Sequence, residues 1–184
     1  KTFFVHRVGD VSFLCGIFLA YKYFGTLEFA DLFKAAAEQP QVISLFSGML
    51  DISAVTAIAL LIFVGAMAKS AQFPLHVWLP DTMDSPTPVS ALMHAGIINA
   101  GGFLLNRLAP FYAFSPNTLH IVFVIGVLTV LLGASMMLAQ NDIKKMLGFS
   151  TMGQMGYMIM ECGLGAFALA IFHLIAHGLF KASL

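Results

Sequence analysis

Charged residues are scarce in this sequence. Asp, Glu, Lys and Arg together make up 10% of its 184 residues, whereas a soluble domain has about 25%. Hydrophobic residues reach 59%, above the roughly 45–50% that is usual. The 9 basic residues balance the 9 acidic ones, so the chain has no basic surface of the kind that binds nucleic acid. This composition excludes an ordinary soluble domain and favours helices that cross a lipid bilayer.

Residues that hold cofactors are also scarce. Cys15 and Cys162 lie in separate apolar stretches, which gives neither a disulfide framework nor a CxxC metal site. The sequence has no glycine-rich phosphate loop, no haem attachment motif and no nucleophile with an aligned base. We therefore expect no cofactor and no metal here, so that any redox chemistry would belong to partner subunits.

The uncharged stretches predict an all-α, polytopic membrane helix bundle with about six transmembrane segments. At least one segment is expected to be broken, because the longest run contains Pro74, which removes a backbone donor. Residues 25–47 mix charged and apolar side chains and predict an interfacial segment. The predicted spans are residues 8–24, 50–79, 89–106, 118–139, 143–160 and 163–184.

The ends of the sequence and its glycines add three expectations. The chain begins with Lys1 rather than Met and stops at Leu184 without a helix stop signal, which predicts a fragment of a larger subunit. A small excess of Lys and Arg puts the start of the first span on the cytoplasmic side. Gly148, Gly153 and Gly156 are expected to permit close helix contact in the span 143–160.

Ionisable side chains inside a span cost about 2.5–3.5 kcal/mol on insertion scales, so they indicate function. His173, His177 and Lys181 recur at i, i+4 and i+8, which places them on one helix face about 6 Å apart in rise. Imidazole titrates near pH 6.5 in water, so this stripe is predicted to exchange protons near neutrality. Two alternatives are that each histidine only binds a neighbouring helix, or that the pair binds a metal. The metal is disfavoured because no Glu follows His173.

Other ionisable residues also fall in or beside the spans. Lys69 precedes the break at Pro74 and is expected to meet water there, although it could also extend its amine to the membrane surface. His94 lies in the predicted helix 89–106, and Lys144 opens the helix 143–160, where an interfacial position is the alternative. Arg7 and Asp10 are spaced to form an ion pair. Glu161 is expected to contact water between two spans.

Several motifs carry a family resemblance. Residues 68–81 (AKSAQFPLHVWLPD) and 86–95 (PTPVSALMHA) resemble the antiporter-like membrane subunits of respiratory complex I, and so do residues 141–145 (NDIKK), 150–157 (STMGQMGY) and 172–182 (FHLIAHGLFKA). The subgroup most similar to the chain is subunit 5, also called the L subunit, which is similar to the large subunit of multisubunit Na⁺/H⁺ antiporters.

This resemblance implies a proton path through broken helices. It matches Lys69 to the family's lysine at the first broken helix and His94 to the histidine that neighbours this lysine. Lys144 matches the bridging lysine, and His173, His177 and Lys181 match the central relay. Arg7 and Asp10 match an Arg-Val-Gly-Asp element. The glutamate that the family pairs with its first lysine would lie before Lys1, and the family's terminal lysine would lie after Leu184.

Two segments depart from that pattern. Residues 96–107 (GIINAGGFLLNR) and 161–167 (ECGLGAF) look more like the membrane subunit of DAB inorganic-carbon accumulation complexes, which pairs with a zinc-containing partner. The resemblance thus implies a proton-translocating subunit of an NADH:quinone oxidoreductase-type complex, without a redox centre of its own. The alternatives are a subunit of a DAB-type transporter or of a Na⁺/H⁺ antiporter, and a carrier for an organic solute.

The expected surroundings follow from the same reasoning. We expect the chain to be an integral protein of a bacterial cytoplasmic membrane, in contact with lipid and with other membrane subunits, and to move H⁺ or Na⁺. No nucleic acid partner is expected.

Overall fold

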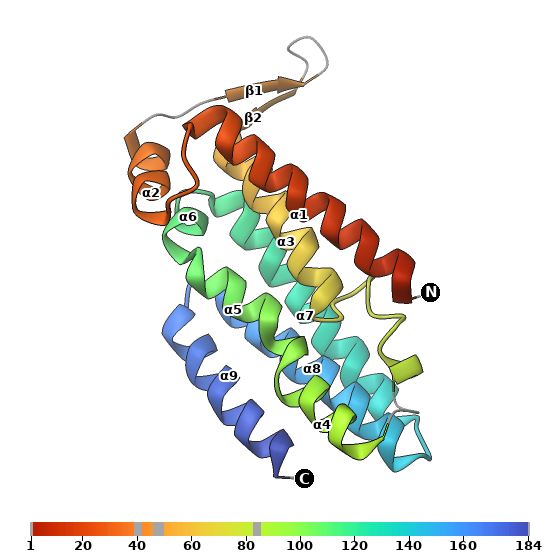
Figure 1. The fold of residues 1–184 in the computed structure, drawn as a ribbon. Coiled ribbons are helices and arrows are strands. Elements are labelled where there is room, and N and C mark those ends of the chain that lie inside the picture. Colours follow the sequence, from red (N-terminus) through yellow and green to blue (C-terminus); the bar gives the residue numbers. More distant parts are fainter. Residues whose placement is uncertain (1, 39–41, 46–49, 83–85, 184) are drawn as a thin grey trace.

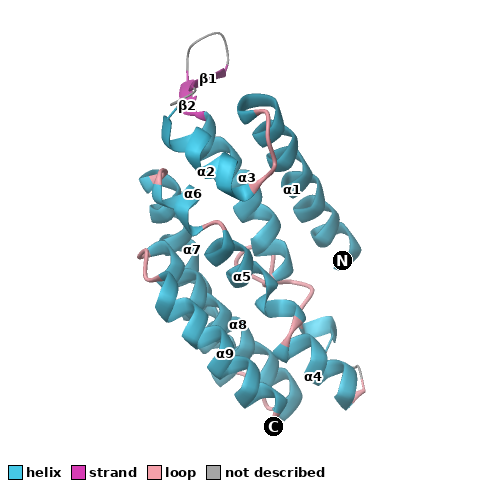
Figure 2. Ribbon diagram, turned by 60° about the vertical axis from the view of Figure 1, so that its left-hand side comes forward, coloured by secondary structure: helices cyan, strands magenta, loops and turns pink. Residues whose placement is uncertain are grey.

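The computed structural model describes residues 2–38, 42–45, 50–82 and 86–183. The helices run broadly along one direction, with α1 at one edge of the bundle and α9 at the opposite edge (Figure 1). Helix accounts for most of the described chain (Figure 2). The predicted helix bundle is therefore confirmed.

The elements have the following bounds: α1 Thr2–Phe24, α2 Phe29–Glu38, β1 Val42–Leu45, β2 Leu50–Ser53, α3 Ala54–Lys69, η1 Pro80–Thr82, α4 Thr87–Ala95, η2 Ile97–Asn99, α5 Ala100–Arg107, α6 Ala109–Ala113, α7 Pro116–Leu138, α8 Ile143–Gly163 and α9 Phe167–Ala182.

Three helical stretches in the described chain are long and apolar enough to cross a membrane: Thr2–Phe24, Pro88–Arg107 and Pro116–Leu138. The apolar helices α3 and α9 are shorter, and α8 contains Lys144 and Lys145. The six crossings and their limits therefore stay predictions. The predicted interfacial segment 25–47 contains α2, whereas its residues 39–41 and 46–47 lie outside the described residues.

A small hairpin departs from the all-helical prediction. Strands β1 and β2 pair antiparallel, with Val42 opposite Ser53 and Leu45 opposite Leu50. The span predicted from residue 50 accordingly begins as a strand, and α3 begins only at Ala54. Ser53 caps that helix, because its side chain accepts a hydrogen bond of 3.2 Å from the backbone N–H of Thr56.

The helical path breaks twice. α3 ends at Lys69, and the described residues 70–82, which include Pro74, contain no α-helix. The second break, at Gly96 and η2, interrupts the stretch 89–106 that the sequence predicted as one helix. Glycine favours a break because it is a poor helix former.

A single side chain joins the two breaks. The Ser70 hydroxyl donates to the Ile98 carbonyl at 2.6 Å and accepts from the Gly101 N–H at 3.0 Å. Ser70 is fully buried, so its hydroxyl satisfies backbone groups that have no access to water. The indole N–H of Trp78 donates to the Ala68 carbonyl at 3.0 Å and holds the unwound chain against α3.

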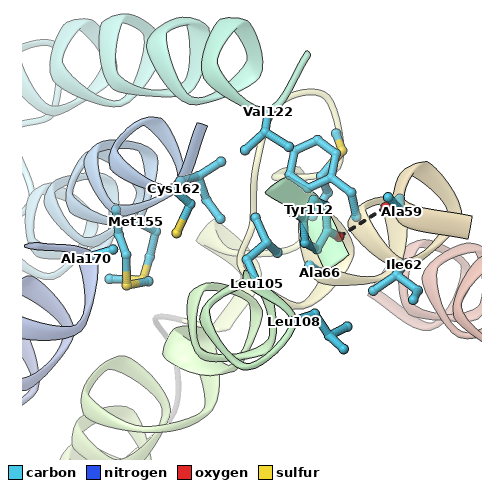
Figure 3. Close-up of a cluster of buried hydrophobic side chains, with 14 of the residues drawn as sticks. Ala59, Ile62, Ala66, Leu105, Leu108, Tyr112, Val122, Met155, Cys162 and Ala170 are labelled. Carbon is cyan, nitrogen blue, oxygen red and sulfur yellow. Dashed lines mark hydrogen bonds between the residues drawn. The ribbon is translucent and has the colours of Figure 1, made fainter. Parts of the chain in front are cut away.

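The buried core lies between α3, α5, α6, α7, α8 and α9. Figure 3 draws buried side chains of this core, among them Leu105, Val122 and Met155 from three different helices. Tyr112 is fully buried, and its hydroxyl donates to the Ala59 carbonyl at 3.0 Å. The tyrosine thereby ties the short helix α6 to α3.

Glycines let α7 and α8 approach closely. A Cβ on Gly156 would lie 2.8 Å from the Val130 nitrogen, and one on Gly133 would lie 2.8 Å from the Gly153 nitrogen. Backbone therefore meets backbone along this interface. The expected role is confirmed for Gly156, whereas a Cβ on Gly153 would meet its nearest neighbour, the Ala134 nitrogen, only at 4.0 Å.

Candidate functional site

The first polar cluster joins α1 to the end of α3. The Lys69 ammonium lies 3.1 Å from one Asp10 oxygen, and the Arg7 guanidinium lies 3.5 Å from the other. The predicted Arg7–Asp10 pair is present. The contact between Asp10 and Lys69 is one that the sequence analysis missed, because it depends on how α1 packs against α3.

A cavity of about 270 Å³ adjoins this ion pair. Asp10 and Lys69 form part of its wall, while Gly101, Phe103 and Leu104 of α5 form another part. The pair is only partly covered, with 44% of the Lys69 side chain and 34% of the Asp10 side chain exposed. Lys69 is thus positioned between a carboxylate and a space bordered by the helix that follows the second break.

The second polar cluster lies on α9. His173, His177 and Lys181 line one cavity of about 290 Å³ together with Ser150 and Gln154 of α8. The i, i+4, i+8 spacing does place these three side chains on one side of the helix. His177 and Lys181 are buried, with 5% and 8% of their surface exposed.

His94 joins this cluster from another helix. It lies in the last turn of α4, which packs against α9, and it is buried. His94 interacts electrostatically with Lys181 and with His177. The ammonium of Lys181 in turn donates a long hydrogen bond of 3.5 Å to the Leu147 carbonyl of α8. Three helices therefore supply polar groups to one place.

Several of these groups are buried without a hydrogen bond. Neither ring nitrogen of His177 has a partner among the described residues, and the same holds for Nδ1 of His94. An unsatisfied buried polar group costs about 1–3 kcal/mol, so its presence calls for an explanation. A path along which protons or water molecules pass would give these nitrogens transient partners.

His173 has partners at both ring nitrogens. Its Nδ1 lies 3.1 and 3.2 Å from the two carboxylate oxygens of Glu161, and its Nε2 lies 2.9 Å from the amide oxygen of Gln154. The expectation that Glu161 sits in water between two helices is wrong, because α8 continues to Gly163 and only 14% of this side chain is exposed. Gln154 and Glu161 are two turns apart on α8, a spacing that could have revealed their shared face.

Lys144 lies in the exposed first turn of α8. Its backbone N–H donates to the Asp142 side chain at 3.0 Å, which caps the helix. Leu147, whose carbonyl accepts from Lys181, follows one turn later. Lys144 is therefore near the end of α8 that Lys181 contacts.

The two clusters lie on either side of the broken helix. α4 and α5 run in line between α3 and α9 (Figures 1 and 2). α5 borders the Lys69 cavity and also packs against α9. Ser70, next to Lys69, is hydrogen-bonded to Ile98 just beyond His94 in the chain. The second break therefore lies between Lys69 and the α9 cluster.

Comparison with curated proteins finds two groups of relatives. The chain is 54% identical over 183 residues to the "probable inorganic carbon transporter subunit DabB1" of Halothiobacillus neapolitanus, and covers 32% of that protein. It is 46% identical over 187 residues to NADH-quinone oxidoreductase subunit L of Neisseria meningitidis, and covers 28% of it. Both alignments include all of this chain, which thus spans about a third or less of each relative.

A solved structure and a family model agree with these relatives. The Mrp complex from a Dietzia species contains a chain that superposes with a TM-score of 0.87 at 33% identity, over 99% of this chain and 20% of that one. The family model described as "NADH:quinone oxidoreductase/Mrp antiporter, TM" matches residues 1–184. The chain is an integral membrane protein and belongs to the NADH:quinone oxidoreductase/Mrp antiporter transmembrane family.

Proposed function

We propose that this chain forms part of a proton-translocating, antiporter-like membrane subunit. In this proposal protons pass between Lys69 and the α9 cluster, across the break between α4 and α5, with water bridging the gaps. The observation that carries it is the burial of His94, His177 and Lys181 around one place, with ring nitrogens that lack fixed partners in the described chain. Ionisable groups inside an apolar bundle are costly and mark functional sites, among them ion pathways and proton relays.

Each predicted site residue has a role in this proposal. Asp10 holds Lys69 at the first end of the path and is itself paired with Arg7. His94 connects the break to α9, and Lys181 ends the cluster beside Leu147. Lys144 is assigned to a bridge beyond Lys181. The residues that act chemically are those that bind and release a proton: Lys69, His94, Lys144, His173, His177 and Lys181.

Removing either lysine tests the proposal. We expect Lys69→Met and Lys181→Met each to reduce proton flux to the background of empty vesicles, because Met fills similar space and carries no proton. Flux is measured in vesicles that contain the full-length subunit with its partner subunits, and assembly is checked by size-exclusion chromatography. Lys34→Met, an exposed lysine on α2, is the matched control. Normal flux in both lysine variants would refute the proposal.

The complex to which the subunit belongs is a second question. Identity to the probable inorganic carbon transporter subunit exceeds identity to subunit L, at 54% against 46%. We therefore propose an inorganic-carbon transporter as the alternative to a quinone oxidoreductase, with other membrane subunits as partners and a bacterial cytoplasmic membrane as the location. Purification of the full-length protein from its own membranes distinguishes the two complexes. A zinc-containing soluble partner would support the inorganic-carbon transporter, and quinone oxidoreductase subunits would support the quinone oxidoreductase.

A further inference from the structure

Among the described residues of the helices that build the α9 cluster, Glu161 is the sole carboxylate. The described helices α4, α5, α8 and α9 contain one acidic residue between them, whereas His94, His173, His177 and Lys181 all carry positive charge when protonated. Both Glu161 oxygens lie close to the same nitrogen of His173, at 3.1 and 3.2 Å. An ionised carboxylate accepts hydrogen bonds and does not donate them, so an ionised Glu161 requires Nδ1 of His173 to be the donor in this contact.

The other nitrogen of His173 has different surroundings. Nε2 lies 2.9 Å from Gln154, whose amide can accept through its oxygen or donate through its nitrogen after a half turn. Gln154 and His173 line the α9 cavity together with His177 and Lys181. The ring of His177 is the next along the stripe, with its centroid 6.5 Å from that of His173. Nε2 is therefore bonded to a residue of the cavity wall that His177 and Lys181 also line.

We infer that Glu161 is a positioning residue that keeps a hydrogen on Nδ1 of His173, so that Nε2 is the nitrogen that gains and loses a proton. The hydrogen bond at one ring nitrogen determines which nitrogen carries the proton. When Nε2 is protonated, its N–H donates to the Gln154 oxygen and the imidazolium charge is balanced by Glu161. When the proton leaves to water in the cavity, the Gln154 amide turns and donates to the Nε2 lone pair. The role in transport rests on the proton path proposed above, whereas the position of the hydrogen does not.

The position of that hydrogen can be measured directly. In the full-length subunit within its complex, ¹⁵N-labelled histidine gives ring signals, and those of His173 are identified by their loss in His173→Gln. At a pH at which the ring is neutral, we expect the wild-type hydrogen on Nδ1. In Glu161→Met it should move to Nε2, because the Gln154 oxygen remains as an acceptor while Nδ1 has lost its own. Glu161→Asp should restore Nδ1–H, and Glu38→Met, an exposed glutamate on α2, should change nothing.

Proton flux provides the second readout. We expect Glu161→Met to reduce proton flux at least about tenfold. In enzymes, a catalytic histidine held in the wrong tautomer lowers the reaction rate by much more than tenfold. A wild-type hydrogen on Nε2, or Nδ1–H retained in Glu161→Met, would overturn the inference, and the wild-type spectrum alone decides if the variant does not assemble. If proton flux is unchanged in Lys69→Met and in Lys181→Met, the proposed function fails. If the hydrogen of His173 still moves from Nδ1 to Nε2 in Glu161→Met, the positioning role of Glu161 stands.

Discussion

Asp10 contacts two basic side chains with its two oxygens. The contact with Lys69 is the shorter, at 3.1 Å against 3.5 Å for Arg7, and Lys69 is the residue that faces the cavity beside α5. Exposed ion pairs stabilise a fold by about 0.2–1 kcal/mol. The carboxylate therefore matters more for the position and charge of Lys69 than for stability.

Asp10→Asn separates these two roles. We expect the free energy of unfolding of the assembled complex to fall by less than about 1 kcal/mol, because the ion pair between Asp10 and Lys69 is partly solvated. Proton flux should fall severalfold, since Lys69 loses the charge that holds its ammonium at the cavity. Asp31→Asn, at an exposed position of α2, is the control and should leave both quantities unchanged. Unchanged flux in Asp10→Asn would remove Asp10 from the path.

The sequence alone predicted which ionisable residues lie in apolar surroundings. Lysines and histidines in apolar stretches are visible in the sequence, and the stripe on α9 follows from helix geometry alone. The partners of these residues were harder to predict. Asp10 reaches Lys69 only because α1 packs against α3, and Glu161 reaches His173 only because α8 continues past the predicted end of its span.

At the scale of elements, the α7–α8 pair depends on close backbone contact. Gly156 faces the Val130 nitrogen across the interface, and the structure leaves no room for a side chain there. Gly153, one turn away on α8, has an open position by comparison, with its nearest contact at 4.0 Å. The two glycines thus offer a matched comparison within one helix.

We expect Gly156→Ala to destabilise the assembled protein by about 1–3 kcal/mol, because the added methyl forces the helices apart. Gly153→Ala should be neutral or slightly stabilising, since Ala is the better helix former by about 1 kcal/mol. Thermal unfolding followed by circular dichroism measures both. Equal losses of stability in the two variants would contradict the interface described here.

Long apolar helices were predictable, whereas the second break was not. The spans 8–24 and 118–139, predicted from hydropathy, fall on α1 (Thr2–Phe24) and α7 (Pro116–Leu138), with ends that differ by at most six residues. Gly96 gives a weak local signal, and the broken conformation is stabilised by Ser70, which lies far away in the sequence and bonds Ile98 and Gly101. The hairpin of β1 and β2 was missed because its strands have only four residues each.

At the scale of the whole molecule, two polar clusters lie on opposite sides of a broken helix. Lys69 and Asp10 lie on one side, between α1, α3 and α5, and the α9 cluster lies on the other. Each cluster borders a cavity, and the Ser70 hydroxyl lies between them at the break. Both cavities are small, at about 270 and 290 Å³, which agrees better with the proposed proton path than with a site for a large substrate.

The central claim is that Lys181 carries a proton and does not merely supply a charge. Lys181→Arg tests it most directly, because arginine keeps the positive charge but is not deprotonated in proteins. Proton flux is measured in vesicles with the full-length complex, beside Lys34→Arg on α2 as the control. The account predicts background flux in Lys181→Arg with normal assembly and normal flux in Lys34→Arg. Wild-type flux in Lys181→Arg would contradict it.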